Sequence, residues 1–157
     1  MGFVILLLGV ASLETAAEPL QGQDTVLAIE DAWVRALPPT QPNTAAYLTL
    51  VNRGGGAIIV VSASADVAEQ VEMHTTRSVD GLMRMEQLQS LKVAAGERLE
   101  LAPGGTHLML LGLQTMPVPG DTVQLCLQLS PDGEICTLAD VRKSRDASDS
   151  QNHQQHH

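Results

Sequence analysis

Aromatic side chains are nearly absent from this sequence of 157 residues, which contains one Trp, one Tyr and one Phe. Hydrophobic residues nevertheless make up 44% of the chain, so the core must be built from aliphatic side chains. A chain of this length forms a single domain with room for such a core.

Basic residues are also scarce, since 9 Lys and Arg against 18 Asp and Glu give a formal net charge of -9. Nucleic acids and anionic membrane surfaces would repel such a chain, so neither is expected as a partner. No apolar run reaches the roughly 20 residues that a membrane-spanning helix needs, so stable insertion into a membrane is not expected either.

Catalytic motifs are missing as well. The chain has no Ser-His-Asp constellation, no Gly-rich phosphate loop, no H-E-x-x-H and no Cys-x-x-Cys. Its acidic residues are scattered and are typical of a solvated surface. The sequence therefore predicts a protein that is not an enzyme.

The first 17 residues are typical of an export signal. The apolar run Gly2–Ala11 has the length of a signal core, and Thr15, Ala16 and Ala17 are small residues suited to cleavage. No Lys or Arg precedes the run, which leaves a buried N-terminal strand as an alternative. We expect cleavage near Ala17 and a periplasmic protein; the lack of a nearby Cys disfavours a lipid anchor.

From Asp24 onward, short runs of β-branched and aliphatic residues alternate with turn signals rich in Gly, Pro, Asn and Asp. This pattern predicts an all-β domain over residues 18–141, a Greek-key sandwich or barrel of eight or nine strands. Residues 65–73 could form one short helical turn. The strands are expected near 26–36, 45–52, 57–63, 70–76, 82–89, 97–101, 106–113, 121–129 and 134–141.

The sequence contains two cysteines, Cys126 and Cys136, on the arms of a predicted hairpin. A three-residue Pro-Asp-Gly loop would place them diagonally, about 7 Å or more apart, which is long for a disulfide. A five-residue loop would place them directly opposite each other. The sequence leaves both registers, and therefore the disulfide, open.

Residues 142–157 are polar and cannot bury a core, so they are predicted to form a disordered tail. The tail carries His153, His156 and His157. These side chains could bind a second metal ion, or the tail could be solvated without a ligand.

Outside the tail the chain has two histidines, His74 and His107, and its methionines other than Met1 all lie between residues 73 and 116. The turn SVDG at residues 78–81 would fold the strands on either side of it into a hairpin and bring Met85 within a residue or two of His74. His107 and Met109 share one face of a strand because side chains alternate. Each residue alone would be read as core packing, but together they place two imidazoles and two thioethers on one patch.

Such a donor set has a preferred ion. Thioether sulfur is a poor ligand for Zn²⁺, Mg²⁺ or Ca²⁺, whereas imidazole with Met sulfur suits Cu(I). Burying the single charge of Cu(I) among neutral ligands also costs less than burying a doubly charged ion. The patch therefore predicts reversible copper binding.

The spacing His74-x10-Met85-x21-His107-x-Met109 resembles the H-x10-M-x21-H-x-M pattern of the bacterial periplasmic copper chaperone family PCu(A)C. The resemblance extends from Ile29 to Val141 and includes the segments AWVRALPPTQPNTAAYLTLVNRGG, VEMH, DGLMRM, LAPGGTHLMLLGL and GDTVQLCLQLSPDG.

The resemblance implies a cupredoxin-like β-barrel that binds Cu(I) at those four residues. It also implies delivery of copper to the subunit of cytochrome c oxidase that carries the CuA site, in partnership with a Sco-type protein. The tail is similar to the His- or Met-rich extensions of some members, which implies a second copper, Cu(II), there. A monomer is expected. Met73 and Met83 do not belong to the four ligands and are assigned to core packing, with an auxiliary contact to copper as the alternative.

Three alternatives remain. A copper-storage or copper-resistance protein would bind the metal without delivering it. A blue-copper protein needs a Cys thiolate with neighbouring His ligands, which the segment ICTLADVR does not supply. A purely structural β-sandwich would use the Met cluster as core.

Overall fold

The computed structural model describes residues 26–131 and 133–144. This part of the chain contains ten β-strands and no α-helix, and hence no helix capable of crossing a membrane. The strands are β1 (Leu27–Arg35), β2 (Thr44–Asn52), β3 (Ile58–Ala65), β4 (Gln70–Val79), β5 (Leu82–Leu88), β6 (Leu91–Val93), β7 (Arg98–Leu101), β8 (His107–Leu111), β9 (Thr122–Ser130) and β10 (Glu134–Arg142).

The nine predicted strands are all present, and one strand, β6, was not anticipated because it is only 3 residues long. The helical turn expected at residues 65–73 is wrong. The amide of Ala68 donates to the carbonyl of Ala65 at 3.3 Å, which makes one tight turn, and β4 begins at Gln70. Pairing of β4 with β8 imposes the strand on this segment.

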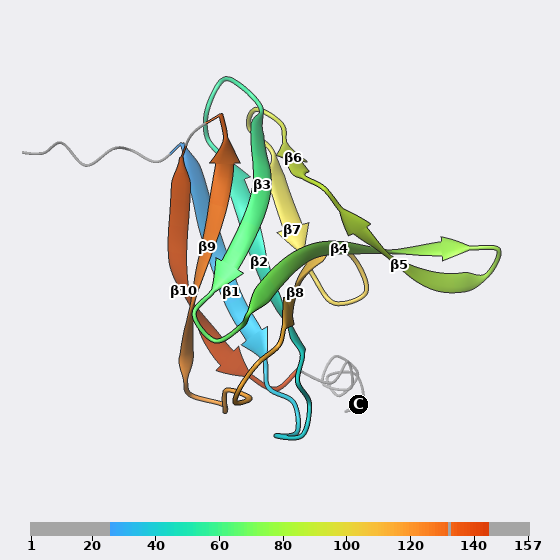
Figure 1. Cartoon of the computed structure of the whole chain (residues 1–157). Coiled ribbons are helices and arrows are strands. Elements are labelled where there is room, and N and C mark those ends of the chain that lie inside the picture. The colour runs from blue at the N-terminus through green and yellow to red at the C-terminus, as the bar shows by residue number, and fades with distance from the viewer. Residues whose placement is uncertain (1–25, 132, 145–157) are drawn as a thin grey trace, which may run out of the picture.

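The strands form a closed barrel (Figure 1). Their hydrogen-bonded order runs β5-β4-β8-β2-β1-β10-β9-β3-β6, and β7 pairs separately with β2. A bridge between Ala63 and Val71 joins β3 to β4 and completes a ring of seven strands. The pairing of β1 with β10 is parallel, whereas the other pairings are antiparallel.

The core is aliphatic, as the composition predicts, and side chains of the barrel strands alternate between it and the outer surface. In β8, Leu108 and Leu110 are fully buried, while His107 and Met109 lie on the opposite face. The core takes buried residues from most strands: Val34, Ala46, Leu48, Leu50, Val60, Met73, Leu91, Val93, Leu101, Val123, Leu125, Leu127, Ala139 and Val141.

The β4–β5 hairpin extends away from the barrel (Figure 1). Val79 pairs with Leu82, so its turn consists of Asp80 and Gly81, both at positive φ (53° and 79°). Asp-Gly in this conformation matches the twist of paired strands. Most of β5 is exposed because the strand has no barrel neighbour beyond β4 in the strand order.

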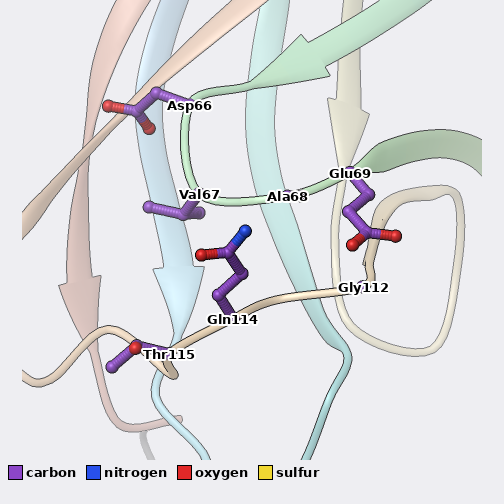
Figure 2. Close-up of a pocket in the computed structure, with 7 residues that line it drawn as sticks. All are labelled: Asp66, Val67, Ala68, Glu69, Gly112, Gln114 and Thr115. Atoms are coloured by element: carbon purple, nitrogen blue, oxygen red, sulfur yellow. The ribbon is translucent and has the colours of Figure 1, made fainter.

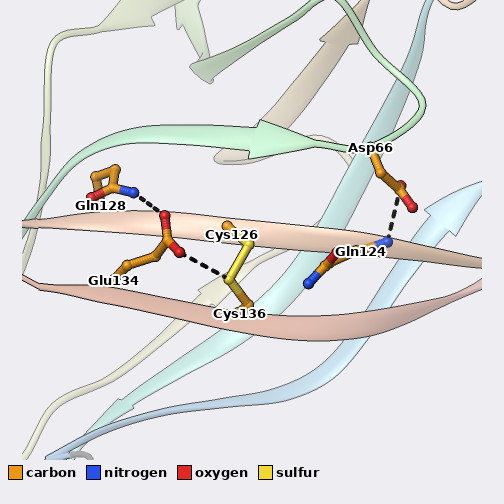
Figure 3. Close-up of a disulfide and its surroundings, with 6 residues drawn as sticks. All are labelled: Asp66, Gln124, Cys126, Gln128, Glu134 and Cys136. Carbon is orange, nitrogen blue, oxygen red and sulfur yellow. Dashed lines mark hydrogen bonds between the residues drawn. A yellow bond between two sulfur atoms is a disulfide. The ribbon is translucent and has the colours of Figure 1, made fainter.

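The β9–β10 hairpin has the register in which the cysteines face each other. Cys126 pairs directly with Cys136, and the two form a disulfide with their Cα atoms 4.0 Å apart (Figure 3). The amide of Leu129 donates to the carbonyl of Gly133 at 2.8 Å, which closes the longer loop. The loop of five residues, rather than three, therefore decides the pairing.

A bulge in β1 brings the single Trp to the outer surface. The β1–β2 register shifts between Glu30 and Trp33, where Asp31 has a positive φ of 52°. Because one extra residue reverses which side chains face the core, Trp33 pairs with Tyr47 on the outer face. Simple alternation along the sequence does not reveal this reversal.

Trp33 and Tyr47 pack against each other between two arginines. Their ring centroids are 4.5 Å apart, the Arg35 guanidinium lies 5.2 Å from the Tyr47 ring and that of Arg142 lies 4.7 Å from the Trp33 ring. Burial raises the pKa of the Tyr47 hydroxyl, and the positive charge of Arg35 partly opposes this shift. The cluster is a set of cation–π contacts beside His107, whose ring lies 6.3 Å from Tyr47.

Replacing a core leucine should cost far more stability than replacing an exposed one on the same hairpin. Leu125 is 0% exposed and Leu138 is 66% exposed. We expect Leu125→Ala to lower the free energy of unfolding by about 3 kcal/mol because it leaves a cavity. Leu138→Ala should change it by less than about 0.5 kcal/mol. Urea denaturation measures both, and equal losses would contradict the assignment of the barrel interior.

Tyr47 should titrate above its ordinary pKa of 10.0 because burial disfavours the phenolate. Since it is the only tyrosine in the chain, ultraviolet absorbance of the phenolate reports it alone. Arg35→Gln should raise the pKa further, because a positive charge that favours the phenolate is lost. The stabilising effect of the neutral hydroxyl is complete below pH 10.0 and is lost as the pH rises through the raised pKa. A midpoint at or below the ordinary value would contradict this.

Candidate metal site

His74 and His107 face each other across the β4–β8 pair. The antiparallel register matches these two residues directly, so their side chains share the outer face of the barrel. Their ring centroids are 5.9 Å apart, with the planes inclined at 62°. The structure thus brings the two sequence-predicted imidazoles together.

Met109 lies two residues beyond His107 on the same face of β8. It is matched with Glu72 of β4 on one side and with Ala45 of β2 on the other. Met109 is half-buried, whereas His107 is only 6% exposed. Met109 therefore lies next to His107 on the outer face of β8, between β4 and β2.

Met85 comes from the projecting hairpin. It is matched with Thr76, two residues along β4 from His74, so it shares the outer face with that imidazole. The side chain is 54% exposed. Of the four predicted ligands, Met85 is the one most accessible to solvent and to an incoming molecule.

A pocket of about 390 Å³ lies on this face of the barrel. Three of the four predicted ligands, Met85, His107 and Met109, line it, and His74 adjoins it through His107. The other lining residues come from β1, β2, β4 and two loops: Arg35, Leu37, Gln41, Asn43, Thr44, Ala45, Tyr47, Thr76 and Gly104.

Hydrogen bonds leave one nitrogen of each imidazole available. Nδ1 of His107 lies 3.0 Å from the carbonyl oxygen of Gly105, to which it donates. Nε2 of His74 lies 2.7 Å from Oε2 of Glu72, a contact in which the ring donates to the carboxylate. The remaining nitrogens, Nε2 of His107 and Nδ1 of His74, then carry lone pairs that can bind a metal ion.

Nδ1 of the His74 ring is buried and has no hydrogen-bond partner. Within residues 26–131 and 133–144, the buried side-chain nitrogen and oxygen atoms without a hydrogen-bond partner are this nitrogen and Nε of Arg35. A buried nitrogen without a partner is costly in a folded protein. A metal ion bound to Nδ1 would satisfy it.

Sequence reasoning missed Glu72. A carboxylate that accepts a hydrogen bond from the second ring nitrogen fixes the orientation of a metal-binding His and increases its basicity. Glu72 lies two residues before His74 on the same strand face, so alternation along VEMH could have identified it.

The two other methionines assigned to packing divide between core and surface. Met73 is 5% exposed and belongs to the core, as predicted. Met83 is 65% exposed, so its assignment to core packing is wrong. It lies near the tip of the β4–β5 hairpin, opposite Ser78, where no barrel layer covers it.

A second pocket, of about 310 Å³, lies below the turn between β3 and β4 (Figure 2). Asp66 and Glu69 contribute carboxylates, but Asp66 accepts a hydrogen bond from the amide of Gln124 at 3.1 Å. None of the four predicted ligands lines this pocket.

Two further predictions lie outside the described residues. They are the tail ligands His153, His156 and His157, and the export signal at residues 1–17.

Comparison with solved structures confirms the cupredoxin-like all-β fold. The apo PCuAC domain of PmoF2 has 20% sequence identity, with a TM-score of 0.64 over 77% of this chain and 93% of that one. Apo-DR1885 from Deinococcus radiodurans is 30% identical, with a TM-score of 0.61 over 91% of this chain and 97% of that one. The structure of CuI-DR1885 is 31% identical, with a TM-score of 0.60 over 78% and 81% of the two chains.

Sequence comparison identifies the family. Residues 27–141 match the family described as "Putative lipoprotein LpqE-like". The protein "Putative lipoprotein Lxx21020" of Leifsonia xyli subsp. xyli (strain CTCB07) is 33% identical over 130 residues, covering 82% of this chain and 74% of that one. A match over nearly the whole barrel, together with this relative, shows that the chain belongs to the LpqE-like family.

Proposed function

We propose that the protein is a carrier of copper that binds one Cu(I) ion through His74, Met85, His107 and Met109. The observation that carries this proposal is the arrangement of the donors. Two adjacent imidazoles each keep one nitrogen free of hydrogen bonds, and two thioethers lie on the same face of the barrel. Imidazole nitrogen with thioether sulfur favours Cu(I) over harder cations.

The relatives support the proposal. DR1885, at 30–31% identity, has been solved both as the apo protein and in its CuI form, and a PCuAC domain from PmoF2 has been solved bound to copper. The spacing His74-x10-Met85-x21-His107-x-Met109 is the pattern expected of copper chaperones of that type. The resemblance and the geometry therefore point to the same four side chains.

The site is suited to exchange as well as to binding. Four neutral donors hold a single positive charge without a thiolate, so the ion is less tightly held than in a Cys site. Met85 is more than half exposed, so an incoming donor can approach the ion there and displace that thioether first. The remaining ligands would then leave in turn, without any opening of the core.

We propose further that the copper is delivered for assembly of the CuA site of cytochrome c oxidase, with a Sco-type protein as partner. In this role the protein binds and releases metal and catalyses no reaction. The alternative is a copper-storage or copper-resistance protein, which would hold the same ion without passing it on. Transfer to a defined acceptor separates the two.

The domain boundaries and location form part of the same proposal. Residues 1–17 would direct export to the periplasm, residues 18–141 would bind copper as a monomer, and residues 142–157 would form a tail. His153, His156 and His157 in that tail would offer a second site for Cu(II). The family match over residues 27–141 supports the end of the proposed copper-binding domain at Val141.

Loss of a barrel ligand should abolish tight Cu(I) binding. We expect the chain truncated after Ser144 to bind one Cu(I) in competition with a chromogenic Cu(I) chelator. His107→Ala and Met109→Ala should each weaken binding by more than about 100-fold, because losing a ligand exceeds the 10–100-fold cost of losing a ligand's hydrogen-bond partner. Truncation removes the tail histidines and so assigns the ion to the barrel.

Three further variants accompany this titration, and the first of them is its control. Met83→Ala removes an exposed thioether of the same hairpin and should leave the affinity unchanged. Glu72→Ala should weaken binding by about 10–100-fold, while Glu72→Gln, which keeps an acceptor oxygen, should weaken it less. If His107→Ala and Met109→Ala titrate like the parent, the site is misassigned.

Copper should pass from the loaded protein to an acceptor. We expect a purified, copper-free CuA domain to gain copper after incubation with the Cu(I)-loaded chain, as measured by metal analysis after the two are separated. Met85→Ala, which removes the exposed donor, should speed release of copper to a chelator. Retention of copper by the chain, while a Cu(I) chelate of equal affinity loads the same domain, would favour storage over delivery.

A further inference from the structure

The disulfide lies on the outer face of the barrel, away from the copper site proposed above. Cys126 of β9 and Cys136 of β10 point outward, since their neighbours Leu125 and Leu127 are buried in the core. Cys136 is exposed and Cys126 is half-buried. A reductant can therefore reach the S–S bond without opening the core (Figure 3).

The bridge is not the only link that holds these two strands in the sheet. β9 pairs with β3 as well as with β10, and β10 pairs with β1. The β9–β10 ladder extends from the Glu134–Gln128 pair to the Asp140–Thr122 pair. After reduction, the ladder would keep the two cysteines directly opposite each other.

A third donor lies beside the two sulfurs. Oε1 of Glu134 is 3.5 Å from Sγ of Cys136, and its other carboxylate oxygen accepts a hydrogen bond from the side-chain amide of Gln128. One ligand atom each from Cys126, Glu134 and Cys136 lies within 4.8 Å of the others. Metal–sulfur bonds of about 2.3 Å, the value for zinc, let one ion join sulfurs up to about 4.6 Å apart.

We propose that reduction of this disulfide creates a second Cu(I) site, formed by the thiolates of Cys126 and Cys136 with Glu134 at its edge. Thiolates are the softest donors in the chain, and soft donors select Cu(I). In the oxidised protein neither sulfur carries a charge to offer a metal, so the site exists only in the reduced state. The redox state of the bridge thus sets how many copper ions the barrel holds.

The reductant is a dithiol. One of its thiolates attacks a cysteine sulfur, the S–S bond breaks and the other cysteine leaves as a thiolate. The second thiol of the reductant then attacks the mixed disulfide and releases the second cysteine. The dithiol loses two electrons and becomes a disulfide, while the protein gains two. Cu(I) then binds the two thiolates in place of their protons and keeps its oxidation state.

The test uses the full-length chain carrying His107→Ala and Met109→Ala, which disables the first site. Half of the sample is reduced with a water-soluble phosphine, which takes up the oxygen of one water molecule as the disulfide becomes two thiols. Both halves are then titrated with Cu(I) against a chromogenic chelator. We expect the reduced half to bind one more Cu(I) than the oxidised half, with new near-ultraviolet absorption from thiolate-bound copper.

The same background with Cys126→Ser and Cys136→Ser is the matched control, and it should bind no additional copper after phosphine treatment. Equal stoichiometry in reduced and oxidised protein would overturn the proposal, as would displacement of the added copper by an equimolar amount of Zn²⁺. Failure of the four-ligand site is distinguishable, because it would make the parent and the His107→Ala, Met109→Ala variant alike before any reduction.

Discussion

The antiparallel register between β4 and β8 is the constraint on which the candidate metal site depends. It sets His74 opposite His107 and Glu72 opposite Met109 on the outer face. The same register sets Met73 opposite Leu108 on the inner face, where both are buried. A slip of one residue would exchange the two faces and expose the core side chains to water. Burial of the aliphatic core therefore holds the proposed metal ligands in place.

The side chains that stabilise the barrel and the proposed metal ligands lie on opposite faces of its strands. Its interior is filled mainly by leucine, valine and alanine from nine of the ten strands, and the proposed metal ligands lie outside that layer. The row of rings from Trp33 through Tyr47 to His107 covers the outer surface next to the pocket. Changes among these outer residues affect the core only indirectly, which is the arrangement expected when binding residues are carried by a rigid scaffold.

Much of this organisation could be predicted from the sequence because it depends on alternation and turn residues. Nine strands and the Asp80–Gly81 turn follow from local pattern. The short strand β6, the bulge before Trp33 and the loop that places Cys126 opposite Cys136 depend on partners distant in the chain. Met83 was misassigned for the same reason, since alternation specifies a face but not whether another layer covers it.

The four proposed donors are not equally well supported by the sheet, because one of them lies on the projecting β4–β5 hairpin. His74, His107 and Met109 lie on β4 and β8, which are strands of the closed ring. Met85 lies on β5, which pairs with β4 alone. The hairpin can bend while the ring stays intact, because β5 is mostly exposed and its movement brings little buried apolar surface into contact with water. For an ion bound as proposed, the number of sulfur donors would therefore be adjustable at small energetic cost, and the speed of metal exchange could change without any change in the thermal stability of the domain.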